Sequence, residues 1–170
     1  MNLYLVRHGP AVEFGEHGVT RDADRMLSQE GRKKTKEAAL GLKRVPDLEV
    51  DRIVSSPLIR ARETAEIIAS VIAPGCAVET AREMEPGTPP DRVAHWLGGL
   101  LSGSTMLVGH MPDLSYLASR LVCPAGAVEI PFKKAAILCL SFANRIASGG
   151  GQIEWLLQPG ILRALARAAD

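Results

Sequence analysis

The sequence predicts an α/β protein: a three-layer sandwich with a mostly parallel central sheet, helices on both faces and an antiparallel hairpin at one edge. Short apolar runs of strand length alternate with amphipathic stretches of helical period along most of the chain. Two runs, 3–6 and 105–108, are apolar at successive positions, which is typical of strands buried on both faces. Near the C-terminus, two further runs flank a glycine-rich loop at 148–151, and this pattern indicates a hairpin.

Six strands are expected from the apolar runs. They lie at 3–6, 52–55, 77–79, 105–108, 135–140 and 152–157. The third is the weakest, because it has only a short apolar core. Since helices separate the first four runs, these strands are expected to be parallel, while the last two form the edge hairpin.

Five helices are expected between and after these strands. They cover 28–43, 57–72, 91–101, 112–122 and a terminal stretch from about 160. Ser28 is expected to cap the first helix. Ser56 is expected to cap the second, with Pro57 at its first helical position. The terminal helix is expected to turn four apolar residues inward: Ile161, Leu162, Leu165 and Ala169.

Length and composition indicate one ordinary folded domain, which we place over 1–170. Hydrophobic residues make up 46% and charged residues 23% of the chain, as in typical globular proteins. The net charge of +1 argues against a surface that coats nucleic acid. The scattered Cys76, Cys123 and Cys139 predict neither a disulfide framework nor a zinc site. The short apolar start is too brief for a signal peptide or a membrane span, so we expect a soluble cytoplasmic protein without a membrane partner.

Basic residues follow three of the predicted strands at their carboxyl ends, where open α/β sheets form their sites. Arg7, His8 and Gly9 follow the first strand, Arg60 lies beyond the second, and His110 follows the fourth. Arginine offers a permanently charged fork for phosphate oxygens, and neutral imidazole is a nucleophile near neutral pH. A glycine beside the nucleophile lets the backbone approach a ligand closely.

The remaining titratable residues show no spacing typical of a metal site. There is no carboxylate cluster for magnesium and no Cys/His pattern for zinc. His17 and His95 are interpreted as ordinary surface or packing residues. The residues therefore predict a phosphoryl-transfer site that uses no metal and no cofactor.

Three motifs in order resemble those of the histidine phosphatase superfamily, the phosphoglycerate-mutase-like group. The stretch 5–9 resembles its RHG motif, 56–65 its second motif, and 108–110 its third. The segment 22–31 resembles the D-x-x-R-x-L-T-x-x-G stretch of the SixA-type phosphohistidine phosphatases, except that Met-Leu-Ser stands where Pro-Leu-Thr is usual. The resemblance extends over 3–159.

The resemblance implies a role for each matching residue. His8 would be the nucleophile that takes the phosphoryl group, and Arg7, Arg60 and His110 would hold its oxygens close to the backbone of Gly9.

Other residues carry weaker assignments. Glu83 is the nearest match to the general acid of the family, with Glu85 as its neighbour. Arg25 would either touch the phosphate or anchor its own loop, and both readings stay open. Arg62 and Glu63 are expected to be charges on a helix surface.

The implied activity is that of a metal-independent phosphatase with a covalent phosphohistidine intermediate. Its expected substrate is phosphohistidine on a signalling protein, such as a histidine-containing phosphotransfer domain, because little chain is left over for lids that enclose a small substrate. A small-metabolite phosphomonoesterase is the alternative enzyme, and a mutase is less favoured. A non-catalytic phosphate-binding module is the alternative from another class.

Overall fold

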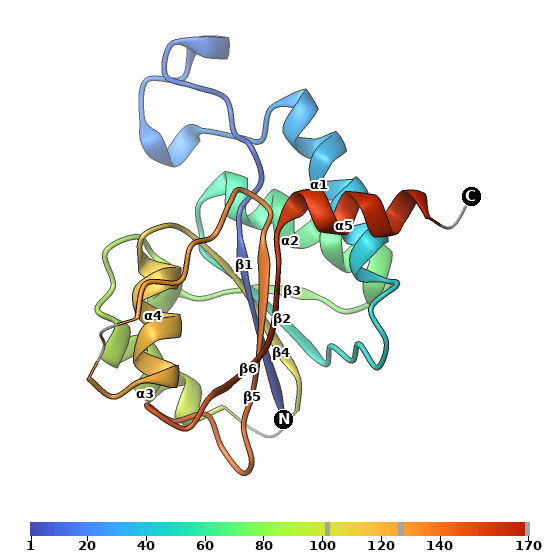
Figure 1. Ribbon diagram of the computed structural model, residues 1–170. Coiled ribbons are helices and arrows are strands. Elements are labelled where there is room, and N and C mark those ends of the chain that lie inside the picture. Colours follow the sequence, from blue (N-terminus) through green and yellow to red (C-terminus); the bar gives the residue numbers. More distant parts are fainter. Residues whose placement is uncertain (101–102, 126–127, 169–170) are drawn as a thin grey trace.

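The computed structural model describes residues 1–100, 103–125 and 128–168 (Figure 1). Its centre is one six-stranded sheet with the strand order β3-β2-β4-β1-β5-β6. Four parallel strands form one side of the sheet: β1 (Asn2–Arg7), β2 (Arg52–Ser55), β3 (Val78–Thr80) and β4 (Thr105–Gly109). The antiparallel edge consists of β5 (Ile137–Ser141) and β6 (Gln152–Leu157). The predicted fold class is therefore confirmed.

Helices cover both faces of this sheet (Figure 1). One face carries α1 (Gln29–Leu42), α2 (Ile59–Ile72) and α5 (Pro159–Arg167). The other face carries α3 (Pro90–Gly98) and α4 (Asp113–Val122). Three short 3-10 turns complete the described elements: η1 (Glu16–Gly18), η2 (Asp22–Asp24) and η3 (Arg82–Met84). No helix in the described part of the chain is both long and apolar enough to cross a membrane.

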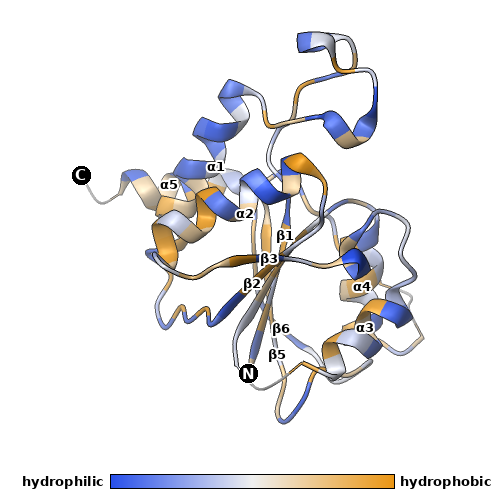
Figure 2. Cartoon of the chain, turned by 180° about the vertical axis from the view of Figure 1, so that it is seen from behind, coloured by the Kyte–Doolittle hydropathy of each residue, from blue (hydrophilic) through white to orange (hydrophobic). Residues whose placement is uncertain are grey.

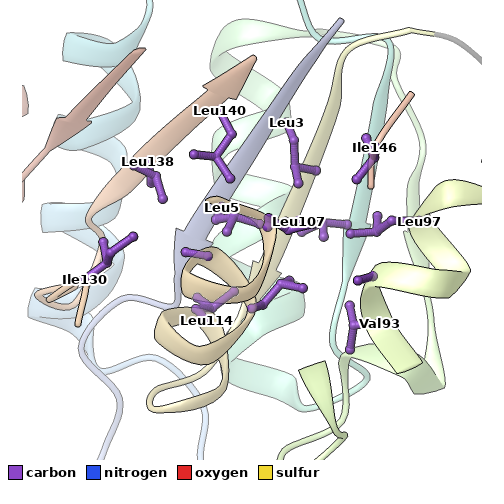
Figure 3. Close-up of a cluster of buried hydrophobic side chains, with 14 of the residues drawn as sticks. Leu3, Leu5, Val93, Leu97, Leu107, Leu114, Ile130, Leu138, Leu140 and Ile146 are labelled. Atoms are coloured by element: carbon purple, nitrogen blue, oxygen red, sulfur yellow. The ribbon is translucent and has the colours of Figure 1, made fainter. Parts of the chain in front are cut away.

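The successive apolar residues of β1 have a direct structural explanation, since the two faces of the strand enter different cores. Leu3 and Leu5 join the core beneath α3 and α4, whereas Tyr4 and Val6 join the core beneath α1, α2 and α5. Figure 3 shows the first of these cores, with Leu3, Leu5 and Leu107 of the sheet facing Leu114 of α4. In Figure 2 the central strands are hydrophobic and the outer turns of α1 are hydrophilic.

The start of the hairpin differs from the prediction. The fifth strand begins at Ile137 rather than at 135, because Ala135 has a left-handed backbone with φ 65°. Its N–H points to the carbonyl oxygens of Arg7 and His8, at 3.1 and 3.2 Å. Ala135 therefore belongs to a loop that is fastened to the end of β1.

The second helix also begins differently. It starts at Ile59, with Leu58 at the N-cap position, so Pro57 precedes the helix and Ser56 is not its cap. Ser56 instead lies within 2.8 Å of His110. The cap of α1 is confirmed, because the Ser28 hydroxyl accepts a hydrogen bond from the N–H of Gly31 at 3.0 Å.

The third and the terminal helix each differ from the prediction in one respect, the end of the former and the orientation of the latter. The third helix ends at Gly98 rather than at 101, and residue 101 lies outside the described residues. The terminal helix packs on α1 through Leu162. The two helices come close because Gly41 has no side chain; a Cβ there would lie 1.8 Å from the Leu162 carbonyl oxygen. This contact sets the rotation of α5 and leaves Ile161 50% exposed, so its predicted inward orientation is wrong. Leu165 is half-buried, and Ala169 lies outside the described residues.

A protruding segment, 11–27, follows β1 and leaves the body of the molecule beyond the carboxyl ends of the parallel strands (Figure 1). It contains η1 and η2 and closes on itself through an antiparallel bridge between Ala11 and Leu27. This position brings η2 to the edge of the sheet where the predicted site residues lie.

Candidate active site

The two histidines predicted to lie together do so because β1 and β4 are neighbours in register. Arg7 pairs with Gly109 at the ends of these strands, and the backbone N–H of His8 donates to the Gly109 carbonyl at 3.0 Å. The imidazole centroids of His8 and His110 are 5.1 Å apart, with the ring planes inclined by 53°. The site therefore depends on the pairing of two central parallel strands.

The ring of His8 has a defined chemical state. Its Nδ1 lies 2.7 Å from the carbonyl oxygen of Gly9. A carbonyl can only accept, so Nδ1 carries the hydrogen and Nε2 carries the lone pair. Burial lowers the pKa of His8 from 6.5 to about 4; the hydrogen bond to Gly9 opposes this, and the charges of Arg60 and Arg7 add to it. The ring is therefore neutral at pH 7 and has a nucleophilic nitrogen.

Two buried threonines support the loop that carries His8. Thr64 of α2 accepts a hydrogen bond from the Gly9 N–H at 3.0 Å and donates to the carbonyl of Arg60 at 2.7 Å. Thr35 of α1 packs below Gly9 so closely that a Cβ there would lie 2.2 Å from its hydroxyl oxygen. Packing therefore requires glycine at the position after His8.

Both predicted arginines are held by their outer nitrogens. Arg7 donates from Nη1 to the carbonyl of Phe132 at 2.7 Å. Arg60 donates from Nη1 to the Asp22 carbonyl at 2.7 Å and from Nη2 to the Asp22 carboxylate at 2.8 Å. In each arginine, Nε is buried without a hydrogen-bond partner among the described residues. The Nη atoms thus orient each guanidinium, while its Nε–H has no acceptor among the described residues.

Asp22 responds to this contact. Burial raises the pKa of its carboxyl, but hydrogen bonds and charges from Arg60 and Arg25 outweigh burial and leave the pKa below its usual value. Asp22 is therefore ionised, and it links η2 to α2 through a charged pair in which Arg60 is 5% exposed.

His110 is held at one nitrogen as well. Its Nε2 lies 2.8 Å from the hydroxyl of Ser56, while Nδ1 is buried and has no partner in the described part of the chain. Burial lowers the pKa of His110 from 6.5 to about 3, with smaller contributions from the nearby His8 and Arg60. Buried nitrogens without partners are rare in folded proteins, and this site contains three of them. The two arginine Nε atoms among them can only donate, so an oxyanion is a suitable acceptor for them.

Arg25 makes its contacts within the protruding segment. Its Nε donates to the carbonyl of Val12 at 2.7 Å, Nη2 to Glu13 at 2.9 Å, and Nη1 to Asp22 at 3.3 Å. The guanidinium also lies over the ring of Phe14, 5.3 Å from its centroid. These contacts anchor the segment, while a contact between Arg25 and a phosphate stays a prediction.

Of the two charges expected on the surface of α2, one differs. Arg62 is exposed and lies near Glu66, at 3.9 Å, as expected for a surface charge. Glu63 is instead largely buried and accepts from the backbone N–H of Leu27 at 2.7 Å while pairing with Arg32. The expected surface position of Glu63 is therefore wrong, because this carboxylate ties α2 to the end of the protruding segment.

The acid candidates lie beside His110. Glu83 and Glu85 line a small cavity of ≈ 20 Å³ together with His110, which is room for about one water molecule. Asp113, in the first turn of α4, lines the same cavity and accepts from the N–H of Gly87 at 3.2 Å. In the described ranges no group of three or more His, Cys, Asp or Glu side chains is arranged to hold a metal ion.

Sequence reasoning missed the roles of Asp22, Ser56, Thr64 and Asp113 in this site. Asp113 lies three residues after His110 and carried the clearest signal, since helix N-termini beside a strand end often face the site. Asp22 and Thr64 gave no comparable signal, because each acts on a residue from another segment.

Residues 3–88 match the family model of the Histidine phosphatase superfamily (branch 1), and with the fold and site described above this shows that the chain belongs to that superfamily of phosphatase-type enzymes. An uncharacterized protein of Picosynechococcus sp. (strain PCC 7002) is 33% identical over 150 residues, covering 86% of this chain and 88% of that protein. Phosphohistidine phosphatase SixA of Escherichia coli (strain K12) is 26% identical over 162 residues, 94% of each chain. A solved structure of the protein histidine phosphatase SixA complexed with tungstate matches with a TM-score of 0.82 at 25% identity, over 95% of this chain and 99% of that one.

Proposed function

We propose that this protein is a metal-independent phosphatase that removes the phosphoryl group from a phosphohistidine on another protein. The observation that carries the proposal is the neutral, buried ring of His8, whose Nδ1 is committed to the Gly9 carbonyl and whose Nε2 keeps a lone pair. Three further buried nitrogens, on Arg7, Arg60 and His110, lack hydrogen-bond partners in the described ranges. Such nitrogens support the proposal, because the oxygens of a bound phosphoryl group would satisfy them.

The reaction has two steps. In the first, the lone pair of His8 Nε2 attacks phosphorus, the N–P bond of the substrate breaks, and the departing imidazole keeps the bonding electrons and takes up a proton. In the second, a water oxygen attacks the phosphorus on His8, the Nε2–P bond breaks, and inorganic phosphate leaves. The proton lost by the water balances the proton taken up in the first step.

The surrounding residues stabilise the charge on the phosphoryl oxygens. Arg7 and Arg60 supply permanently charged donors, and His110 supplies a neutral one. Gly9 allows the oxygens to approach the backbone. Arg25 would support these donors by holding the segment that carries Asp22. The same hypothesis includes a direct contact between Arg25 and the phosphate.

A phosphorylated protein is the favoured substrate for two reasons. The E. coli relative, named a phosphohistidine phosphatase, matches over 94% of each chain, so the two chains are of similar extent. Imidazole is also a better leaving group than an alkoxide, so phosphohistidine depends less on a placed general acid. The partner we infer is a histidine-containing phosphotransfer domain, and the setting is the cytoplasm.

A small-metabolite phosphomonoesterase is a second candidate, favoured by the cavity beside His110. Glu83, Glu85 and Asp113 line that cavity, and a carboxylic acid near the leaving group is what hydrolysis of an alkyl phosphate needs.

The deciding experiment compares kcat/KM for a phosphorylated histidine phosphotransfer domain with kcat/KM for a panel of small phosphoesters, with and without EDTA. We expect the phosphoprotein to be preferred, EDTA to leave the rate unchanged, and rapid quench to trap phosphate on His8 in a linkage that is labile to acid and stable to base. His8→Ala should be folded and inactive. Wild-type turnover by that variant, or a preference for one small phosphoester, would overturn the proposal.

The role of the acid is tested separately. Glu83→Gln and Glu85→Gln should each change phosphohistidine turnover by less than about tenfold, below the 10²–10⁴ typical of general acid catalysis, and should lower any alkyl phosphate hydrolysis much more. A hundredfold loss on phosphohistidine would favour the phosphomonoesterase.

A further inference from the structure

Ser56 does not cap a helix, and its position raises the question of what its hydroxyl does. The residue is 0% exposed and lies between the end of β2 and the start of α2. Its backbone N–H donates to the Val108 carbonyl at 2.9 Å, which fixes it beside the strand that ends next to His110. Its carbonyl accepts from the hydroxyl of Ser55 at 2.8 Å. The backbone of Ser56 is therefore fixed on both sides, and this determines the position from which its hydroxyl extends.

The hydrogen bonds of this hydroxyl have a direction. Among the described residues its partners are the backbone N–H of Leu58, at 3.4 Å, and His110 Nε2, at 2.8 Å. The backbone N–H can only donate, so Ser56 Oγ accepts from Leu58. The hydroxyl hydrogen then has one acceptor within reach, which is Nε2 of His110. If Nε2 carried a hydrogen instead, the buried hydroxyl would keep an unpaired hydrogen, and an unpaired buried donor is unfavourable.

The state of the His110 ring follows from this direction. A neutral imidazole that accepts at Nε2 carries its hydrogen at Nδ1. Nδ1 is the buried nitrogen that lacks a partner in the described part of the molecule. A hydrogen bond donor that has no acceptor among the described residues, on a ring whose centroid lies 5.1 Å from that of His8, is suited to an oxygen of a bound phosphoryl group.

We propose that Ser56 is a positioning residue that fixes His110 in the Nδ1–H tautomer, so that the neutral ring donates a hydrogen bond from Nδ1 to a phosphoryl oxygen. The tautomer assignment depends only on the hydrogen bonds of Ser56, whereas the identity of the acceptor rests on the proposed function. Ser56 touches neither the nucleophile nor the reacting atoms in this proposal and acts through His110.

The first test measures the tautomer directly and needs no substrate. Two-bond ¹H–¹⁵N spectra of protein labelled with ¹⁵N-histidine distinguish a protonated from a bare ring nitrogen, and His110→Gln identifies the signals of His110. We expect the Nδ1–H tautomer in the wild type and in Ser55→Ala, and a shift towards Nε2–H in Ser56→Ala. Ser55 is the matched control, because it is equally buried and its hydroxyl bonds to a backbone carbonyl rather than to the ring. An Nε2–H tautomer in the wild type, or an unchanged tautomer in Ser56→Ala, would overturn the proposal.

The second test uses inorganic phosphate as the ligand. Ser56→Ala should bind phosphate about tenfold more weakly, as expected for one hydrogen bond, while Ser55→Ala should stay within about twofold of the wild type. If the tautomer changes and phosphate affinity does not, the role of Nδ1 towards the oxyanion is wrong although the assignment of the tautomer stands. If the wild type itself does not bind phosphate, the proposed function fails, and the spectra still decide the role of Ser56.

Discussion

Two fully buried threonines, Thr64 and Thr35, should respond in opposite ways to the same substitution. Both are 0% exposed and both lie against Gly9, one on α2 and one on α1. The Thr64 hydroxyl has two hydrogen bonds, one of them from the N–H of Gly9. The Thr35 hydroxyl has no partner in the described residues. Valine has nearly the shape of threonine and lacks the hydroxyl, so Thr→Val isolates the polar group at each position.

The magnitudes follow from what each valine leaves behind. Thr64→Val leaves the buried Gly9 N–H without an acceptor, and such an unsatisfied donor costs about 1–3 kcal/mol. Thr35→Val removes a buried hydroxyl that gains nothing from hydrogen bonding, so the cost of its desolvation is recovered and stability should be unchanged or higher by about 1 kcal/mol. The two variants should therefore differ from each other in stability by about 1–4 kcal/mol.

Equilibrium unfolding in urea, followed by circular dichroism, measures this difference. Thr35→Val should be the most stable of the three proteins, the wild type should be next, and Thr64→Val should be the least stable. The slope of the unfolding free energy against urea concentration should be the same in all three, because the surface exposed on unfolding does not change. If Thr64→Val is as stable as the wild type, the hydroxyl does not support the loop that carries His8. If Thr35→Val loses as much stability as Thr64→Val, the Thr35 hydroxyl has a partner that the hydrogen bonding described above omits.

Three further outcomes are expected. A Cβ at Gly31 would lie 1.9 Å from a backbone carbonyl oxygen, so Gly31→Ala should lower stability by at least about 1–3 kcal/mol in the same urea assay, whereas Gly160→Ala, with nothing within 4 Å, should not. The pKa of His8 is about 4 in the folded protein and about 6.5 in the unfolded chain, so the unfolded chain takes up the proton at a higher pH. The neutral ring therefore contributes stability that is complete above pH 6.5 and is lost as the pH falls to about 4. Unfolding measured at stepped pH should show a smaller loss of stability over this range in His8→Gln than in the wild type. Arg60→Lys keeps the charge without the fork and should lower kcat/KM by about 10- to 1000-fold, while the surface variant Arg62→Lys should stay within about twofold; equal rates would place Arg60 outside the site.

The parts of the fold that the sequence predicted well are those governed by local pattern. Successive apolar residues marked β1 and β4, because both faces of these strands are buried, and the glycine-rich loop marked the hairpin. The pairing of His8 with His110 was also predictable, since both follow strands that end at the same edge of one parallel sheet.

The parts that could not be predicted depend on contacts between distant segments. Ser56 has the local features of a helix cap, and only the packing of β4 beside β2 gives its hydroxyl a better partner in His110. Asp22 orients Arg60 across 38 positions of the chain, a separation that no periodic pattern encodes. The left-handed backbone of Ala135 is held by carbonyls of the first strand, so the strand that follows starts later than its composition suggests.

The register between β1 and β4 has a consequence for how the molecule is made. His8 and His110 lie roughly a hundred residues apart along the chain, and no shorter stretch contains both. A ribosome that has released the first strand must synthesise most of the remaining chain before the fourth strand can join it. Parallel pairing over so long a separation is slow compared with the formation of local helices. The pair of His8 and His110 therefore cannot assemble in the nascent chain before the fourth strand has been synthesised.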